Sequence, residues 1–229
     1  MIFGDSHAEC FKNQNCELMN ITTHVFTSSS ALGLSNPNAR KQTGNKILEI
    51  LKTVPKTTKI MFYYGKVDVD FVLNNKLNAD PNLSVEDMWA LIPSQVERYI
   101  NFVRPLSREW HVCVMGLFVT HLTDENMFGN LGYATRIMPR EATYEKYTAC
   151  LKAECAKYGI QYCDAPVIDM SKYMPKEPFD HHLHTNVYIE WIPTLCGVLH
   201  SRHHVNSTCL LSTSPSPRDR TRSRMPSSA

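Results

Sequence analysis

Two continuous apolar runs of strand length restrict the fold of this 229-residue chain more than any other feature. Residues 59–64 and 111–119 are almost entirely apolar, without alternation between polar and apolar positions. Such runs are typical of strands that helices cover on both faces of a parallel sheet. Shorter apolar segments at residues 1–3, 24–27 and 160–163 predict three further strands.

Helical patterns occupy the sequence between these strands. Residues 38–52 carry three apolar side chains at helical spacing, and Ser84 and Asp87 have nearly the spacing of a capping box. Further helices are predicted over residues 85–103, which Pro93 is expected to kink or split, and over residues 142–158 and 187–199, with a short one from about residue 7. The alternation predicts an α/β fold with three α/β/α layers and about five parallel strands.

Polar residues follow three of the predicted strands directly. Ser6 follows the first strand, Gly33 lies in the loop after the second, and residues 65–70 follow the third. Ligands of open parallel sheets bind at the carboxyl ends of the strands. Gly4 permits a sharp turn that would present the Ser6 hydroxyl to a cleft as a nucleophile, although these residue types also suit an ordinary turn.

A second polar cluster, which contains Asp180, His181, His182 and His184, precedes the last predicted helix. An aspartate and a histidine supply the acid and base that acyl transfer from a serine requires. A solvated polar loop and a site for a transition metal are the alternative interpretations. We assign no metal and no cofactor.

Charged residues also lie near the end of the third strand. Asp68 and Asp70 either hydrogen-bond to backbone amides or bind a sugar hydroxyl. Lys66 and Arg136 are either ordinary surface cations or contacts for an anionic substrate.

The last residues of the chain differ in composition from the rest. Residues 209–219 closely resemble the read-through translation of a sequencing adapter, so we interpret residues 208–229 as a disordered, non-native tail and residues 1–207 as one domain. A native basic tail that binds nucleic acid is the alternative. Four arginines and Asp219 give the tail a charge of +3, so the chain's formal charge of +2 becomes −1 without it, and nucleic acid loses its support.

The other composition signals concern the compartment and ligand class. Without Cys209, seven cysteines remain and none forms a CxxC pair, which favours reduced thiols. Together with the absence of a visible signal peptide, this favours a cytoplasmic location. No apolar run approaches the roughly 20 residues of a membrane span. Neither a P-loop nor GxGxxG occurs, so nucleotide binding has no support.

The order of four short motifs resembles the SGNH hydrolase superfamily, the GDSL-type esterases and lipases. Its first block, Gly-Asp-Ser, is matched by residues 4–6, with His7 as in a GDSH-starting subgroup, and its second-block glycine by Gly33. Its third block, Gly-x-Asn-Asp, is matched at Gly65 and Asp68, with Val67 in place of the asparagine. Its last block, Asp-x-x-His, corresponds to residues 180–184. The resemblance covers residues 1 to about 200 and implies a flavodoxin-like fold.

The resemblance also implies roles for individual residues. Ser6 is the nucleophile, and its backbone N–H and that of Gly33 donate to the oxyanion. Asp180 orients the basic histidine, which is His182 because Leu183 follows it, with His184 as the competitor. Asn36 is the nearest candidate, beside Asn38, for the donor that Val67 does not supply. Gly65 and Asp68 complete the implied oxyanion and substrate-binding set.

Three functions are therefore to be distinguished. The first is a serine ester hydrolase that acts on a small acyl ester, with a carbohydrate-linked ester as one option. The second is a non-catalytic relative that binds carbohydrate or acts as a scaffold. The third is a metal-binding protein that uses the histidines of residues 181–184.

Overall fold

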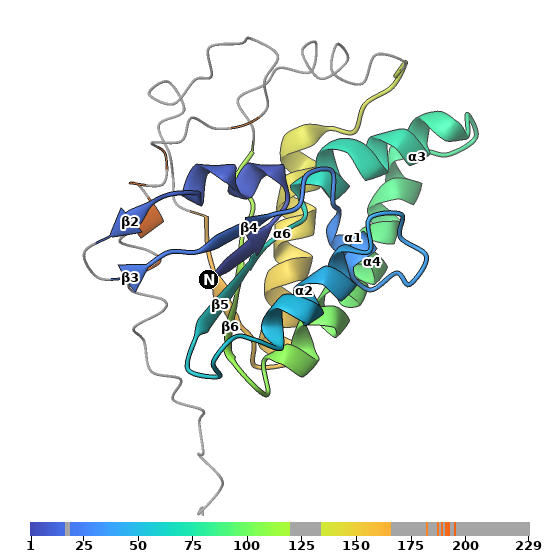
Figure 1. Ribbon diagram of the computed structural model, residues 1–229. Coiled ribbons are helices and arrows are strands. Elements are labelled where there is room, and N and C mark those ends of the chain that lie inside the picture. Colours follow the sequence, from blue (N-terminus) through green and yellow to red (C-terminus); the bar gives the residue numbers. More distant parts are fainter. Residues whose placement is uncertain are drawn as a thin grey trace, which may run out of the picture.

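A computed structural model describes residues 1–16, 19–119 and 134–165, together with residues 182, 187, 189, 191, 192 and 195. Its centre is a sheet of five parallel strands in the order β4-β1-β5-β6-β7 (Figure 1). The strands are β1 Ile2–Gly4, β4 Thr23–Val25, β5 Lys59–Tyr63, β6 His111–Met115 and β7 Gln161–Cys163. The predicted α/β fold with a five-stranded parallel sheet is confirmed.

Helices connect the strands. They are η1 Ser6–Phe11, α1 Ala31–Leu34, α2 Thr43–Leu51, η2 Asp68–Val72, α3 Leu73–Ala79, α4 Val85–Leu106 and α6 Arg140–Lys157. Two short antiparallel strands, β2 Asn15–Cys16 and β3 Met19–Asn20, form a separate pair beside η1 (Figure 1). The sequence patterns did not predict this pair.

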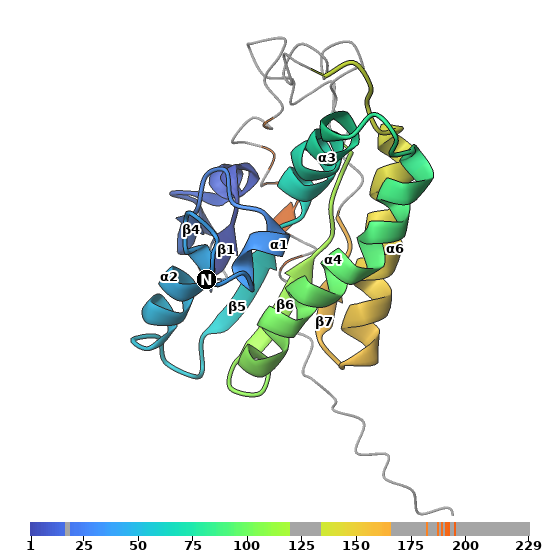
Figure 2. The ribbon, with the colours of Figure 1, turned by 90° about the vertical axis from the view of Figure 1, so that its right-hand side faces the viewer.

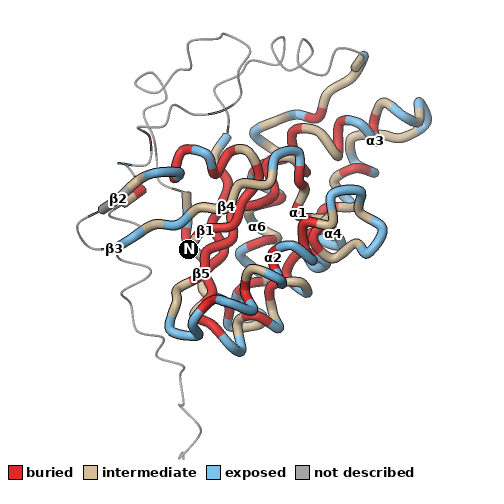
Figure 3. The backbone as a smooth tube through the Cα atoms, viewed as in Figure 1, coloured by how far each residue is buried: buried red, intermediate tan, exposed pale blue. Residues whose placement is uncertain are grey.

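Both faces of the sheet are covered, as β5 shows. Side chains alternate between the two faces of a strand. Phe62 packs edge-on against Phe102 of α4 at 6.2 Å between ring centroids, whereas Tyr63 contacts Trp191 on the opposite face at 5.7 Å. Figure 2 shows α2, α4 and α6 side by side over the first of these faces. Strands β1, β5 and β6 are therefore buried along almost their whole length, whereas β4 is only partly buried (Figure 3).

Some predicted boundaries were wrong. Helix α2 begins at Thr43 because the Gln42 side chain donates to the carbonyls of Pro37 and Ala39, which holds the preceding residues in turns. Strand β6 ends at Met115, not at residue 119. Helix α4 continues through Pro93 without splitting, and its Ser84–Asp87 capping box is confirmed.

The segment from η2 to α3 was not predicted as helical. Its sequence alternates like a strand in Val67-Asp68-Val69-Asp70, yet contacts outside the segment hold it in a helix. The Asn74 side chain donates to the Asp70 carbonyl at 2.9 Å and accepts from the Met138 amide at 2.8 Å. Tertiary contacts thus override the local pattern.

Several predictions fall wholly or partly outside the described residues. These are the acid and the competing base of the last block, Asp180 and His184, and the tail at residues 208–229. Residues 189, 191, 192 and 195 are helical, in agreement with the helix predicted over residues 187–199. Among the described residues, no helix is long and apolar enough to cross a membrane.

Gly4 generates a test of the packing at the end of β1. A Cβ at this position would lie 2.5 Å from the Ala8 Cβ and 2.8 Å from the Tyr63 carbonyl oxygen. We expect Gly4→Ala to reduce the free energy of unfolding by about 1–3 kcal/mol, as overpacking does. Urea denaturation measures the change.

Gly33→Ala is the matched control, because its Cβ would meet only the Ser30 hydroxyl, at 3.1 Å. An equal loss of stability in both variants would contradict the packing argument.

Candidate active site at the carboxyl edge of the sheet

Ser6 lies where β1 gives way to η1. The strand ends at Gly4, whose missing side chain lets the backbone approach Ala8 and β5 closely. Asp5 then caps η1, because its side chain accepts the His7 backbone N–H at 2.9 Å. Ser6 is the first residue of η1 and is partly exposed, whereas Asp5 and His7 are buried. The turn therefore presents Ser6 at the carboxyl edge of the sheet.

Asp5 also binds the His7 ring. Its Oδ1 lies 2.9 Å from Nδ1 of His7, so one carboxylate oxygen serves both the backbone and the ring of the same residue. Burial raises the pKa of Asp5 to about 6, while hydrogen bonds from the His7 and Val67 backbones and the positive charge of Lys66 oppose this rise. When ionised, Asp5 favours the His7 tautomer that carries its proton on Nδ1.

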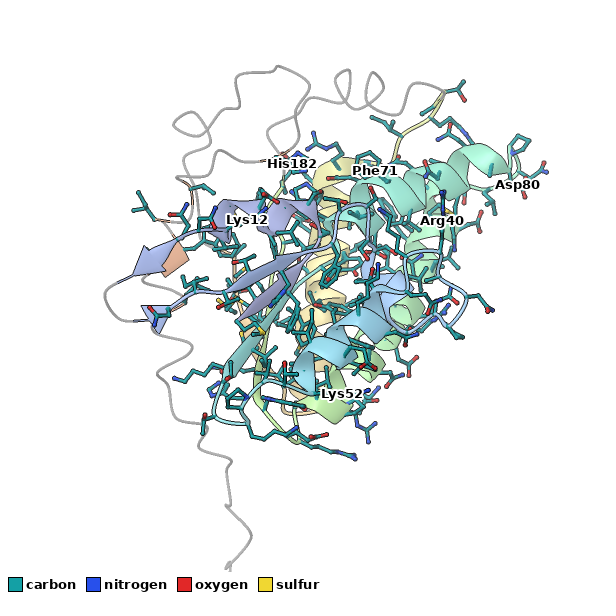
Figure 4. The ribbon with its side chains drawn as sticks, in the orientation of Figure 1. Lys12, Arg40, Lys52, Phe71, Asp80 and His182 are labelled. Atoms are coloured by element: carbon teal, nitrogen blue, oxygen red, sulfur yellow. The ribbon has the colours of Figure 1, made fainter. Side chains whose placement is uncertain are left out.

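His182 lies beside this turn. Its ring centroid is 4.9 Å from that of His7, with the rings tilted by 31°. Figure 4 shows His182 at the end of the sheet where η1 begins. A histidine that is distant in sequence is therefore adjacent to the residue that follows Ser6. Asp180, His181 and His184 lie outside the described residues.

Asp68 connects the end of β5 to α1. Its carboxylate accepts the backbone N–H of Ala31 at 2.6 Å and that of Leu32 at 3.0 Å. Burial raises the pKa of Asp68 to about 7, against the effect of these two hydrogen bonds. Of the two sequence interpretations, the structure supports the backbone-binding one, and substrate contact by this carboxylate stays a prediction.

The other predicted binding residues, Gly33, Asn36 and Gly65, lie in the two segments that the Asp68 carboxylate joins. The Gly33 N–H donates to the Ser30 hydroxyl at 3.0 Å within α1, so its role as an oxyanion donor stays a prediction. Asn36 and Gly33 line the same pocket. Gly65 has a φ of +123°, a conformation that glycine adopts readily, and a Cβ there would lie 2.8 Å from the Tyr147 ring.

Sequence reasoning missed the importance of Lys66. Instead of lying on the surface, this side chain is 1% exposed. Its ammonium donates to the Phe118 carbonyl at 3.1 Å and lies 3.9 Å from the centroid of the Phe118 ring. Burial lowers the pKa of Lys66 to about 8, while the negative charges of Asp70 and Asp5 oppose this fall.

Two further charged residues have structural partners. The Tyr144 hydroxyl lies 2.9 Å from both carboxylate oxygens of Asp70, which is buried. The Arg136 guanidinium donates to the Leu83 carbonyl at 2.8 Å and to the Asp80 carbonyl at 3.0 Å. Contact between Arg136 and an anionic substrate thus receives no support, because its guanidinium holds the chain around α3.

No metal site emerges from the described part of the chain, which contains no group of three or more metal-ligating side chains. Five of the described cysteines are free thiols, namely Cys10, Cys113, Cys150, Cys155 and Cys163. Among the described residues, those at the edge of the sheet include Ser6, the rings of His7 and His182, and the buried carboxylates of Asp5 and Asp68.

Comparison with known proteins gives matches in structure alone. No protein-family model matches the sequence, and no curated protein matches it significantly. A member of the lipolytic G-D-S-L family from Veillonella parvula superposes with a TM-score of 0.50 at 13% identity, over 86% of this chain and 95% of that one. A structure from Streptococcus pneumonia named for platelet activating factor gives 0.53 at 13% identity, over 87% and 82%. The chain therefore has the fold of the lipolytic G-D-S-L proteins, the SGNH hydrolases.

Proposed function

We propose that the protein is a serine ester hydrolase that acts on a small acyl ester. One observation carries the proposal: the His182 ring lies 4.9 Å from the His7 ring and thus beside the turn that presents Ser6. The motif order and the fold shared with the G-D-S-L protein agree with it. A carbohydrate-linked ester is the narrower substrate class that we propose.

The reaction follows the usual course of acyl transfer through a serine. His182 accepts the proton of the Ser6 hydroxyl as its oxygen attacks the ester carbonyl. The proton passes to the leaving alcohol, and the acyl group remains on Ser6. Water, deprotonated by His182, then releases the acid and restores the serine. Asp180 orients His182 in this scheme, and the Ser6 N–H donates to the oxyanion.

The Asp5–His7 pair has a positioning role in the proposed site. Asp5 holds His7 through one oxygen, which binds both the His7 backbone N–H and the ring Nδ1, and the His7 ring in turn packs against His182. The proposed base, His182, is thereby held in place by a residue of the turn that carries Ser6. Lys66 contributes by keeping Asp5 ionised, since a buried cation lowers the pKa of a nearby carboxyl group.

A non-catalytic binding protein is the second candidate. Two observations favour it: Val67 stands where the superfamily has its oxyanion asparagine, and the Gly33 N–H already donates to Ser30. Loss of one oxyanion donor typically lowers turnover by about 100- to 1000-fold. Asn36 and Asn38 are the proposed replacements for the missing amide.

Ser6→Ala separates the two candidates. We expect the wild-type protein to hydrolyse p-nitrophenyl acetate and to react with a fluorophosphonate probe, because both require an activated serine. The variant should lose labelling, and kcat should fall by at least about 1000-fold. Mass spectrometry of the labelled peptide and steady-state kinetics are the measurements.

Ser94→Ala is the matched control, since Ser94 is an exposed serine on α4 that hydrogen-bonds only the Leu91 carbonyl among the described residues. Its activity should remain at the wild-type level. Absence of both labelling and turnover in the wild-type protein would reject the hydrolase in favour of the binding protein.

The buried charges predict a pH dependence. Asp5, with a pKa of about 6, is ionised above that pH and then accepts strong hydrogen bonds from His7. We expect kcat/KM to rise as pH increases through 6. Lys66→Met removes the opposing positive charge, so the pKa of Asp5 increases and the acidic limb of the profile moves to higher pH.

Lys152→Met serves as the control, because Lys152 is exposed and paired with Asp164. Its profile should coincide with that of the wild type. An acidic limb that stays in place in Lys66→Met would show that Lys66 does not control Asp5.

A further inference from the structure

A pocket of about 410 Å³ lies where the chain that follows β4 meets the start of α2. Its polar lining comprises Ser28, Ser29, Ser30, Arg40, Lys41 and Thr43. Gly33 and Asn36, both predicted as binding residues, line it as well. The pocket is thus rich in hydroxyl and cationic groups.

The charges of this pocket are of one sign. Arg40 and Lys41 line it, whereas no aspartate or glutamate is among its described lining residues. The Lys41 ammonium donates to the Thr27 carbonyl at 3.0 Å, which holds it in place. The exposed Arg40 guanidinium has no hydrogen bond or ion pair with any residue that the structure describes. A planar guanidinium with free donors suits an oxyanion.

The pocket is built from chain segments that are held rigidly. Ser28 and Gln42 adopt left-handed backbone conformations, with φ values of 55° and 50°. Such strain in non-glycine residues is often found at ligand-binding sites. The Ser29 hydroxyl donates to that of Thr43 at 2.6 Å, and this bond joins the two segments. The hydroxyl groups are therefore positioned before any ligand binds.

The pocket opens at the same edge of the sheet as Ser6. Its serines follow β4, Ser6 follows β1, and these strands are parallel neighbours. Immediately beyond the strands, the Phe26 N–H donates to the Gly4 carbonyl at 2.8 Å. Asp68 also fixes α1, which bears Gly33, to the end of β5. In the view of Figure 4, Phe71 lies between His182 and Arg40.

We propose that this pocket binds a tetrahedral oxyanion, a phosphate or sulfate group, through Arg40 and the hydroxyls around it. Its place at the same edge of the sheet as Ser6 further assigns that group to the substrate, which is then an acyl ester that also bears a phosphate or sulfate. This assignment to the substrate rests on the proposed ester hydrolysis, whereas the binding of the anion does not.

Isothermal titration calorimetry of the full chain with inorganic phosphate and with sulfate tests anion binding without any turnover. We expect binding by the wild type, with glycerol as an uncharged ligand that gives no heat. Arg40→Met should weaken binding by at least about tenfold, which corresponds to the loss of a charge-assisted hydrogen bond. Arg98→Met, at an exposed arginine of α4 away from the pocket, should bind like the wild type.

Two acetate esters distinguish a substrate group from a free ion. For 4-acetoxyphenyl phosphate, Arg40→Met should raise KM about tenfold and leave kcat unchanged, whereas both constants for uncharged 4-acetoxyanisole should stay the same. An equal effect on the two esters would overturn the assignment to the substrate. Absence of phosphate and sulfate binding by the wild type, or unchanged binding in Arg40→Met, would overturn the anion site. Binding without hydrolysis of either ester would reject the proposed function alone.

Discussion

The structure at the carboxyl edge of the sheet depends on the interactions of one buried group, the ammonium of Lys66. An ammonium removed from water is tolerated only where opposite charges and acceptors surround it. Asp5 at the end of β1, Asp70 in η2 and the Phe118 carbonyl beyond β6 supply these. Because Tyr144 of α6 binds Asp70, the same cluster reaches the helical layer. One positive charge thereby organises groups from four separate parts of the chain.

Asp68 extends this arrangement in the opposite direction along the edge. Its two carboxylate oxygens accept the first two backbone N–H groups of α1, a helix that is too short to be stable alone. The loop between β4 and α2 is thereby attached to the end of β5. The turn that presents Ser6 and the pocket lined by Arg40 and the hydroxyl groups are consequently both supported from one short segment, through Lys66 and Asp68 respectively.

The sequence predicted those features whose signal is local. The apolar runs of β5 and β6 identified buried strands, the Ser84 capping box identified the start of α4, and Gly4-Asp5-Ser6 identified the turn. The helices between residues 68 and 79 were missed, because a hydrogen bond that the Asn74 side chain accepts from the distant Met138 N–H stabilises them. The burial of Lys66 could not be predicted, since its partners come from residues 5, 70 and 118, and no local pattern records their convergence.

Because one Asp5 oxygen accepts two hydrogen bonds, protonation of this carboxylate at low pH affects both structure and activity. Oδ1 accepts both the backbone N–H of His7, in the first turn of η1, and a hydrogen bond from the His7 imidazole, and charge-assisted bonds of this kind are about twice as strong as neutral ones. A single proton on this carboxylate weakens the two bonds together. The helix start that carries Ser6 and the ring that supports His182 therefore loosen in one event, so acid inactivation and local unfolding share a common trigger.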